Sequence, residues 1–267
     1  MVNEICNIRN NIINQKPIIH CITNPISINQ CANTILAVGA RPIMAEHPKE
    51  VSEITEASSG LMLNIGNITD VRMESMIISL KKACEKSIPS VLDVVGAACS
   101  KIRRDYVFEL LKTYNIQIIK GNYSEIMALC DNNYRSPGID AQTTLDMNTV
   151  AKCSTMLAEK YKTVIIATGK TDILADGKKI IYVFNGTPQL TTVTGTGCML
   201  GALCSAFASV SNPLLSAVSA CAVFGICGQL AETDKGGGSF MSNLMDKLST
   251  IKLKEISSYL NLEESTN

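Results

Sequence analysis

Short apolar runs alternate with longer amphipathic segments along most of the chain. The amphipathic segments include Val71–Lys86, Arg104–Tyr114 and Leu145–Lys160, which have the residue spacing of helices. Strands that read as continuous apolar runs are buried on both faces, because helices cover the parallel sheet in which they lie. The alternation therefore predicts an α/β fold with a mostly parallel central sheet covered by helices on both faces. The candidate strands are Pro17–Cys21, Arg41–Ala45, Leu61–Ile65, Ser90–Val94, Ile116–Lys120, Thr163–Thr168 and Ile180–Phe184.

The second half of the chain departs from this alternation. Asp176-Gly177 is a turn signal between the strand-like runs Thr171–Lys178 and Ile180–Phe184, which predicts a hairpin at the edge of the sheet. After Val193 the sequence has helical patterns to its end. No linker rich in proline, glycine or serine divides the chain, so residues 1–267 are expected to form a single domain. The expected C-terminal helices are Gly197–Val210, Leu214–Thr233 and Asn243–Leu260.

No charged residue occurs between Ile180 and Ala231, and Pro213–Leu230 is long enough to cross a membrane. That segment, however, is rich in Ser, Ala, Gly and Cys, contains Gln229, and lacks flanking Lys/Arg or aromatic anchors. Small residues at helical spacing suit close packing inside a protein. We therefore expect a buried helix and no membrane span.

Overall composition excludes several classes of protein. Lys+Arg 24 balance Asp+Glu 24, and a nucleic-acid-binding protein would normally have a basic excess. The 11 cysteines include no CxxC pair, and the 2 histidines, His20 and His47, form no zinc-finger spacing with them. The stretch Met1–Glu4 has no basic region followed by an apolar run, so no signal peptide is expected. These features predict a cytoplasmic protein with free thiols that binds neither nucleic acid nor membrane.

The segment Thr191–Gly201 is the most informative motif. It reads Thr-Thr-Val-Thr-Gly-Thr-Gly-Cys-Met-Leu-Gly, so that a β-like run ends in glycines and an alanine-rich helix begins at once. The start of a helix presents unpaired backbone N–H groups and the positive end of the helix dipole. Glycines also let the backbone approach a ligand closely. The motif therefore predicts a site for a phosphate or another anion.

Acidic and amide side chains follow two of the candidate strands. Asn122 and Glu125 form an Asn-x-x-Glu pattern directly after one strand, and Asp93 lies at the carboxyl end of another. Ligands bind at this edge of open α/β sheets. The pair Asn122 and Glu125 is suited to holding Mg²⁺ through water and polyphosphate oxygens, or to capping the following helix, and both roles are compatible. Asp93 is expected in the metal and phosphate region, with a turn as the alternative.

A series of motifs that runs in order from about His20 to Phe240 resembles the hydroxyethylthiazole kinases, a family of the ribokinase-like superfold. Kinases of that superfold usually have Gly-x-Gly-Asp at the helix start, where the Asp is the catalytic base. Cysteine in that position, here Cys198, is typical of the hydroxyethylthiazole kinases. The other matching motifs are His20–Pro25, Ala32-Asn33, Leu36–Ala45, Leu63–Gly66, Val91–Asp93, Lys120–Asn122, Ser124–Ile126 and Ala167–Lys170.

This resemblance implies ATP-dependent phosphorylation of the hydroxyl of 4-methyl-5-(2-hydroxyethyl)thiazole in thiamine salvage, with Mg²⁺ as cofactor. It also implies a homotrimer with active sites at subunit interfaces. Cys198 is expected to be a weak base or an orienting group, with some thiolate because it lies at a helix start. The implied binding residues are Asn24, Met44, Gly66 and Gly195 for the thiazole alcohol, Lys120, Asn122, Thr168 and Gly197 for ATP, and Asp93 and Glu125 for the metal.

Three positions depart from the family pattern. Val94 stands where the family usually has proline, Asn67 where it generally has threonine, and Gly237 where Gly-Pro-Gly is usual.

Other readings of the chain remain open at this point. Cys198 could be the nucleophile of an acyl transfer with His20 or His47 as base. The chain could be a kinase for a pyrimidine or pyridoxal alcohol, although such relatives usually carry Asp at the cysteine position. It could also be a non-catalytic nucleotide-binding or membrane-associated protein.

Overall fold

The computed structural model describes residues 1–131, 134 and 145–266, and within them nine strands form one sheet. Their order is β2-β1-β3-β4-β5-β6-β7-β8-β9. The pairs from β2 to β6 are parallel, and β7, β8 and β9 extend the sheet in antiparallel fashion. The mostly parallel sheet predicted from the apolar runs is confirmed. The strands are β1 (Ile18–Ile22), β2 (Arg41–Ile43), β3 (Gly60–Asn64), β4 (Ser90–Asp93), β5 (Ile118–Asn122), β6 (Val164–Thr168), β7 (Asp172–Ala175), β8 (Lys179–Val183) and β9 (Leu262–Thr266).

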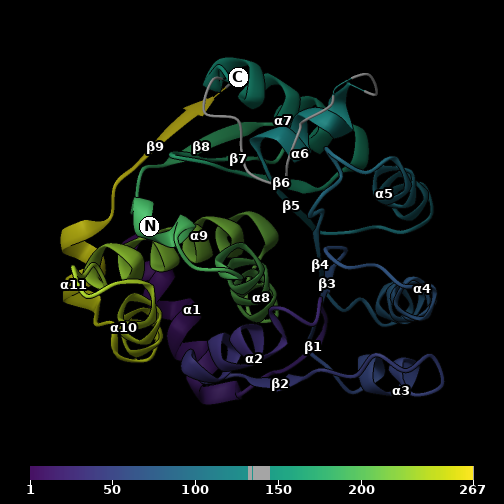
Figure 1. The fold of residues 1–267 in the computed structure, drawn as a ribbon, viewed down its shortest axis with the longest axis horizontal. Coiled ribbons are helices and arrows are strands. Elements are labelled where there is room, and N and C mark those ends of the chain that lie inside the picture. The colour runs from purple at the N-terminus through teal and green to yellow at the C-terminus, as the bar shows by residue number, and fades with distance from the viewer. Residues whose placement is uncertain (132–133, 135–144, 267) are drawn as a thin grey trace.

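Helices cover both faces of the sheet, as the sequence predicts (Figure 1). One face carries α1 (Val2–Gln15), α2 (Ile28–Ala37), α8 (Thr196–Ala208), α9 (Pro213–Leu230), α10 (Gly237–Thr250) and α11 (Leu253–Tyr259), whose apolar side chains form one core. The other face carries α3 (Val51–Glu56), α4 (Asp70–Lys86), α5 (Lys101–Thr113), α6 (Tyr123–Cys130) and α7 (Met147–Tyr161), which form a second core.

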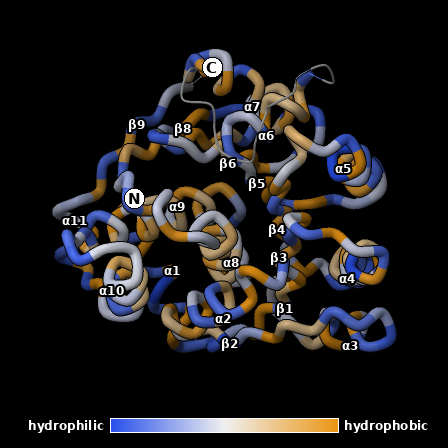
Figure 2. The backbone as a smooth tube through the Cα atoms, in the orientation of Figure 1, coloured by the Kyte–Doolittle hydropathy of each residue, from blue (hydrophilic) through white to orange (hydrophobic). Residues whose placement is uncertain are grey.

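The uncharged segment of the sequence forms the interior of the first face. Helix α9 is the one described helix long and apolar enough to cross a membrane, and 72% of its apolar window is buried. It packs between α8, α10 and the strands β5 to β8. Figure 2 shows α8 and α9 mainly in tan and orange, whereas α4 and α5 mix orange with blue. A helix that is apolar all round has to be buried, so the prediction of a core helix is confirmed.

The structure corrects the C-terminal prediction. The expected helix over residues 243–260 is two helices, because α10 ends at Thr250 and α11 begins at Leu253. The chain then forms β9, which covers β8, so the hairpin of β7 and β8 is not at the sheet edge. Strand β9 was missed because its sequence, Leu-Glu-Glu-Ser-Thr, has no apolar run. Ladder hydrogen bonds and an ion pair between Lys179 and Glu264 (2.6 Å) hold it instead.

Two further expectations need correction. The β-like run before the glycine motif is not a strand, because Pro188–Thr191 form a 3₁₀ turn that leads into the loop before α8. Helices α1, α2 and α3 were not predicted. Helix α3 has only 6 residues, too few for a helical periodicity to mark it.

Candidate active site

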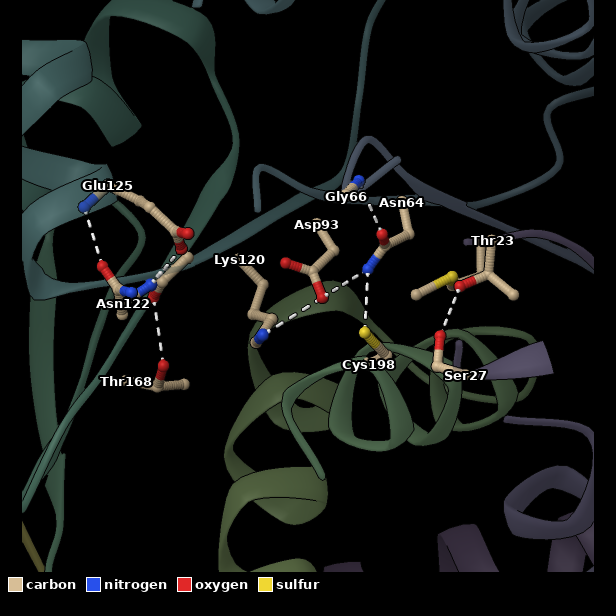
Figure 3. Close-up of polar contacts among 12 residues, drawn as sticks. Thr23, Ser27, Asn64, Gly66, Asp93, Lys120, Asn122, Glu125, Thr168 and Cys198 are labelled. Atoms are coloured by element: carbon tan, nitrogen blue, oxygen red, sulfur yellow. Dashed lines mark hydrogen bonds and ion pairs between the residues drawn. The ribbon is translucent and has the colours of Figure 1, made fainter. Parts of the chain in front are cut away.

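The parallel strands β1, β3, β4, β5 and β6 end at the same edge of the sheet, and polar side chains gather there (Figure 3). Asn64 on β3, Asp93 on β4 and Lys120 on β5 are successive register partners, so their side chains share one face of the sheet. Lys120 Nζ lies 3.1 Å from Asp93 Oδ2, and Asn64 Nδ2 donates to the same oxygen at 3.0 Å. All three side chains are buried. Burial raises the pKa of Asp93, whereas Lys120 and Asn64 oppose that rise.

The amino end of α8 faces this row of side chains. Gly195 precedes the helix with φ +90°, a left-handed conformation that favours glycine. Lys120 Nζ lies only 3.1 Å from the point where a Cβ on Gly197 would stand. The structure thus brings a buried ammonium group to the helix start, where backbone N–H groups have no partner within the helix. The two together offer hydrogen-bond donors suited to a phosphate.

Cys198 lies in the first turn of α8 and is 8% exposed. Its sulfur accepts hydrogen bonds from Asn64 Nδ2 at 3.3 Å and from Asn24 Nδ2 at 3.4 Å. Burial raises the pKa of the thiol, and the nearby charge of Asp93 raises it further, although Lys120 and Ser27 act in the opposite direction. Burial therefore outweighs the effect of the helix start on this pKa, and the direction of the shift favours the neutral thiol.

The residues expected around the thiazole lie beside the thiol, with one exception. Asn24 Nδ2 donates to Asn64 Oδ1 at 3.1 Å, and a Cβ on Gly66 would stand 2.8 Å from that oxygen. A Cβ on Gly195 would stand 3.5 Å from Ser27. Met44 is the exception. It directly follows β2, the strand next to β1, at the same edge of the sheet, and is partly buried against the first core.

Asn122 and Glu125 form a capping box at the start of α6. The Asn122 side chain accepts from Glu125 N–H at 2.9 Å, and Glu125 Oε2 accepts from Asn122 N–H at 2.7 Å. Glu125 Oε1 accepts a further bond from Gly96 N–H at 2.7 Å. Burial and the charge of Asp93 raise the pKa of Glu125 to about 7. Thr168 pairs with Asn122 in the sheet, and its hydroxyl donates to the Gly121 carbonyl at 3.3 Å.

The histidines do not form a nucleophile–base pair with the thiol. His20 lies between Ile19 and Cys21, which both face the core that contains Cys198, so its ring points to the opposite face of the sheet. Its two ring nitrogens bond Thr55 Oγ1 (2.8 Å) and the Ala45 carbonyl (3.0 Å), and burial lowers its pKa. In the described part of the chain, no hydrogen bond joins Cys198 to either histidine. This geometry does not support an acyl transfer.

The three departures from the family pattern fit the structure. Val94 N–H donates to the Lys120 carbonyl at 2.9 Å, a bond that proline could not make. Asn67 contacts Arg72 through its backbone carbonyl (2.7 Å), so this contact does not depend on the side chain. Gly237 is the first residue of α10, a position at which proline and glycine both fit.

Asn64 also belongs to the site, although the sequence indicated it only as part of the motif Leu63–Gly66. Its signal was a polar side chain at the carboxyl end of an apolar strand, the same signal that selected Asp93. Ser27 was also missed. It bonds Thr23 Oγ1 at 3.1 Å, and nothing in the local sequence distinguishes it from other serines at helix starts.

The fold itself occurs among small-molecule kinases. A pyridoxal kinase from Staphylococcus aureus, solved in complex with AMP-PCP and pyridoxal, superposes with a TM-score of 0.64 over 94% of this chain and 99% of that chain. The sequence identity is 12%, so this similarity concerns the fold alone. The chain therefore has the α/β fold of the ribokinase-like class.

More specific similarities cover nearly the whole chain. A hydroxyethylthiazole kinase from Pyrococcus horikoshii OT3 superposes with a TM-score of 0.91 at 33% identity, over 98% of this chain and 99% of that chain. Hydroxyethylthiazole kinase 2 of Clostridium botulinum (strain Langeland) is 45% identical over 249 residues, which are 91% of this chain and 94% of the relative. The profile of the hydroxyethylthiazole kinase family matches residues 10–254. The chain belongs to this family of kinases, which phosphorylate the alcohol of the thiazole, and the family implies ATP as co-substrate.

Proposed function

We propose that the chain transfers the γ-phosphoryl group of ATP to the hydroxyl of 4-methyl-5-(2-hydroxyethyl)thiazole, as a step of thiamine salvage. The observation that most supports this is the position of Cys198. The thiol lies in the first turn of α8, beside the amides of Asn24 and Asn64 and close to the ion pair of Asp93 and Lys120. An alcohol that contacts the thiol would therefore face a phosphate held at the helix start.

In the reaction, the alcohol oxygen forms a bond to the γ-phosphorus while the bond from that phosphorus to the β–γ bridging oxygen breaks. The electron pair of the broken bond leaves with ADP, and the hydroxyl proton passes to an oxygen of the transferred group. Lys120 and the N–H groups at Gly197 and Cys198 would stabilise the charge on this group. Cys198, as a neutral thiol, would orient the hydroxyl and would not remove its proton. Met44, Asn24, Gly66 and Gly195 would hold the thiazole, and Asn122 and Thr168 the nucleotide.

Asp93 and Glu125 have the chemistry to hold Mg²⁺. Asp93 Oδ1 is buried and has no hydrogen-bond partner in the described part of the chain. Asp93 ends β4 and Glu125 follows the neighbouring strand β5, so both carboxylates lie at the same edge of the sheet, and the charge of Asp93 raises the pKa of Glu125. Carboxylate oxygens are preferred Mg²⁺ ligands, and phosphate and water oxygens would complete the coordination. These further ligands would be needed, because among the described residues no group of three or more His, Cys, Asp or Glu could hold a metal by itself. Bound Mg²⁺ would supply charge neutralisation for the phosphates.

We further propose that the protein is a cytoplasmic homotrimer of single-domain subunits, with active sites at the subunit interfaces. An exposed apolar side chain near the site supports such an interface. Ile26 is 63% exposed two residues after Asn24. Balanced charge and the burial of α9 support a protein that binds neither nucleic acid nor membrane.

A coupled assay of ADP release tests the proposed function. The protein would be supplied with ATP, Mg²⁺ and, in separate reactions, hydroxyethylthiazole, hydroxymethylpyrimidine or pyridoxal. We expect turnover with the thiazole and little with the other two alcohols. Turnover only with another alcohol would keep the phosphoryl chemistry but contradict the assignment of the pocket, and no turnover by well-folded protein would contradict the proposal.

A further inference from the structure

We propose that Asn64 is a positioning residue of phosphoryl transfer, which fixes the Cys198 thiol and the Asp93 carboxylate relative to each other. This inference rests on the proposed function and assigns a role to a residue that lies between the thiol and the charged pair of Asp93 and Lys120. Asn64 is the last residue of β3 and is 1% exposed. Figure 3 shows its carboxamide between the thiol on α8 and the carboxylate on β4.

The carboxamide of Asn64 uses its full hydrogen-bonding capacity. Nδ2 donates to Asp93 Oδ2 at 3.0 Å and to Cys198 Sγ at 3.3 Å. Oδ1 accepts from Gly66 N–H at 2.8 Å and from Asn24 Nδ2 at 3.1 Å. Two donors and two acceptor lone pairs are all that a carboxamide has. Any rotation of this group would therefore break several buried bonds at once, which is costly in a dry interior.

The partners of Asn64 also fix which end of the amide faces which neighbour. The backbone N–H of Gly66 can only donate, so Oδ1 has to face it. Asp93, which is paired with Lys120, accepts at Oδ2, so Nδ2 has to face that oxygen. If the amide oxygen and nitrogen exchanged places, Nδ2 would face the N–H donor of Gly66 and Oδ1 would face the acceptor oxygen of Asp93. The orientation of the Asn64 amide therefore follows from its surroundings.

This orientation determines what the thiol can do. Cys198 Sγ receives one N–H from Asn64 and a second from Asn24. The hydrogen of the thiol has to point away from both amides. It is left for the hydroxyl oxygen of a bound substrate. Asn64 thus directs the thiol outward, while its bond to Asp93 ties the thiol to the charged pair beside the phosphate site.

The experiment compares Asn64→Ala and Asn64→Asp with Cys198→Ala and with the double variant Asn64→Ala/Cys198→Ala. Steady-state kinetics would give kcat and the KM values for thiazole and ATP, and thermal unfolding would give the melting temperature. We expect Asn64→Ala to lower kcat about 100-fold, since a misplacement of about 1 Å has that effect. KM for ATP should change by less than about threefold, because no ATP-binding residue bonds Asn64.

Asn64→Asp is the more conservative variant. It keeps the volume of the side chain and both acceptor bonds. It loses the N–H bonds donated to Cys198 and to Asp93 and sets an oxygen against the Asp93 carboxylate, so a loss of kcat at least as large is expected. If Asn64→Ala does not fold, the kcat of Asn64→Asp still tests the inference. The double variant should lie within about threefold of the poorer single variant, because residues that act through one another are not additive.

Asn115→Asp is the matched control for the added charge, because Asn115 is exposed and precedes β5 at the opposite edge of the sheet. It should leave kcat unchanged. Unaltered kcat in a folded Asn64 variant would overturn the inference. So would losses that multiply in the double variant, since Asn64 would then act independently of the thiol. If the wild-type protein does not phosphorylate the thiazole, the proposed function fails. If the wild type is active and the Asn64 variants match it, only the inference on Asn64 fails.

Discussion

The end of β4 and the start of α6 each place a buried carboxylate at the same edge of the sheet, but the two carboxylates are held differently. Asp93 on β4 is held by side chains, because Lys120 and Asn64 share one of its oxygens and the other has no partner in the described part of the chain. Glu125 on α6 is held by the backbone, since each of its oxygens accepts an N–H, from Gly96 and Asn122. Asp93 therefore retains a whole oxygen for a ligand, whereas Glu125 also secures the local fold.

The largest expected effect is that of Asp93→Asn. The variant leaves Lys120 as a buried charge without its ionic partner and removes a charge from the proposed metal site. We expect kcat in the coupled assay to fall by about 1,000-fold. Asp105→Asn is the matched control, because it breaks an exposed pair with Lys101 and should leave activity unchanged. Activity of Asp93→Asn within about tenfold of wild type would contradict the special role of this carboxylate.

The next largest effect concerns the thiol that faces Asp93. Cys198→Ala should lower kcat about 100-fold, because the orienting group is lost. Cys198→Asp should stay closer to wild type, because the amides of Asn24 and Asn64 already point hydrogen-bond donors at this position. Cys204→Ala on the same helix is the control. That residue is buried in the core, so the variant should lower stability without lowering kcat. Equal activity of all these proteins would remove Cys198 from the reaction.

The sequence was sufficient to predict where the site lies. Apolar runs defined the parallel strands, and polar residues such as Asp93 and Asn122 stood at their carboxyl ends, where all parallel strands meet one edge. The glycines before α8 indicated an anion site for a local reason, the unpaired N–H groups of a helix start. These features depend on short stretches of chain, which is why the sequence records them.

The sequence was not sufficient to predict which side chains of the site contact one another. That Lys120 is buried against Asp93 depends on the pairing of β4 with β5, and the four bonds of Asn64 join segments between 2 and 134 residues away along the chain. The raised pKa of Cys198 likewise results from burial in the fold, which outweighs the helix start that suggested a lowered one. Strand β9 escaped prediction because its stability comes from backbone pairing with β8 and not from apolar side chains.

A smaller effect is expected for Glu125→Gln, which tests the backbone-held carboxylate. Glutamine has one acceptor oxygen in place of two, so the N–H of Gly96 or of Asn122 loses its partner. The free energy of unfolding should fall by about 1 kcal/mol. kcat should fall about tenfold, less than for Asp93→Asn, because Asp93 remains. Glu255→Gln, in the capping box of α11, is the control and should lower stability without changing kcat. A loss of activity as large as that of Asp93→Asn would show that the two carboxylates are equivalent.

The smallest expected effect extends the comparison to a third carboxylate, Asp172, at the start of β7. It is partly buried and accepts a bond from Gly169 N–H at 3.1 Å, and desolvation raises its pKa to about 7. Between its ordinary pKa near 4 and about 7, the folded protein keeps a proton that the unfolded chain has lost, so this group makes the protein less stable as pH rises. Asp172→Asn keeps an acceptor for Gly169 but does not titrate. Thermal unfolding should therefore give similar melting temperatures for variant and wild type at pH 4, and a variant that melts a few degrees higher at pH 8. A difference in melting temperature that does not change with pH would contradict the expectation that the raised pKa of Asp172 makes the folded protein less stable as pH rises.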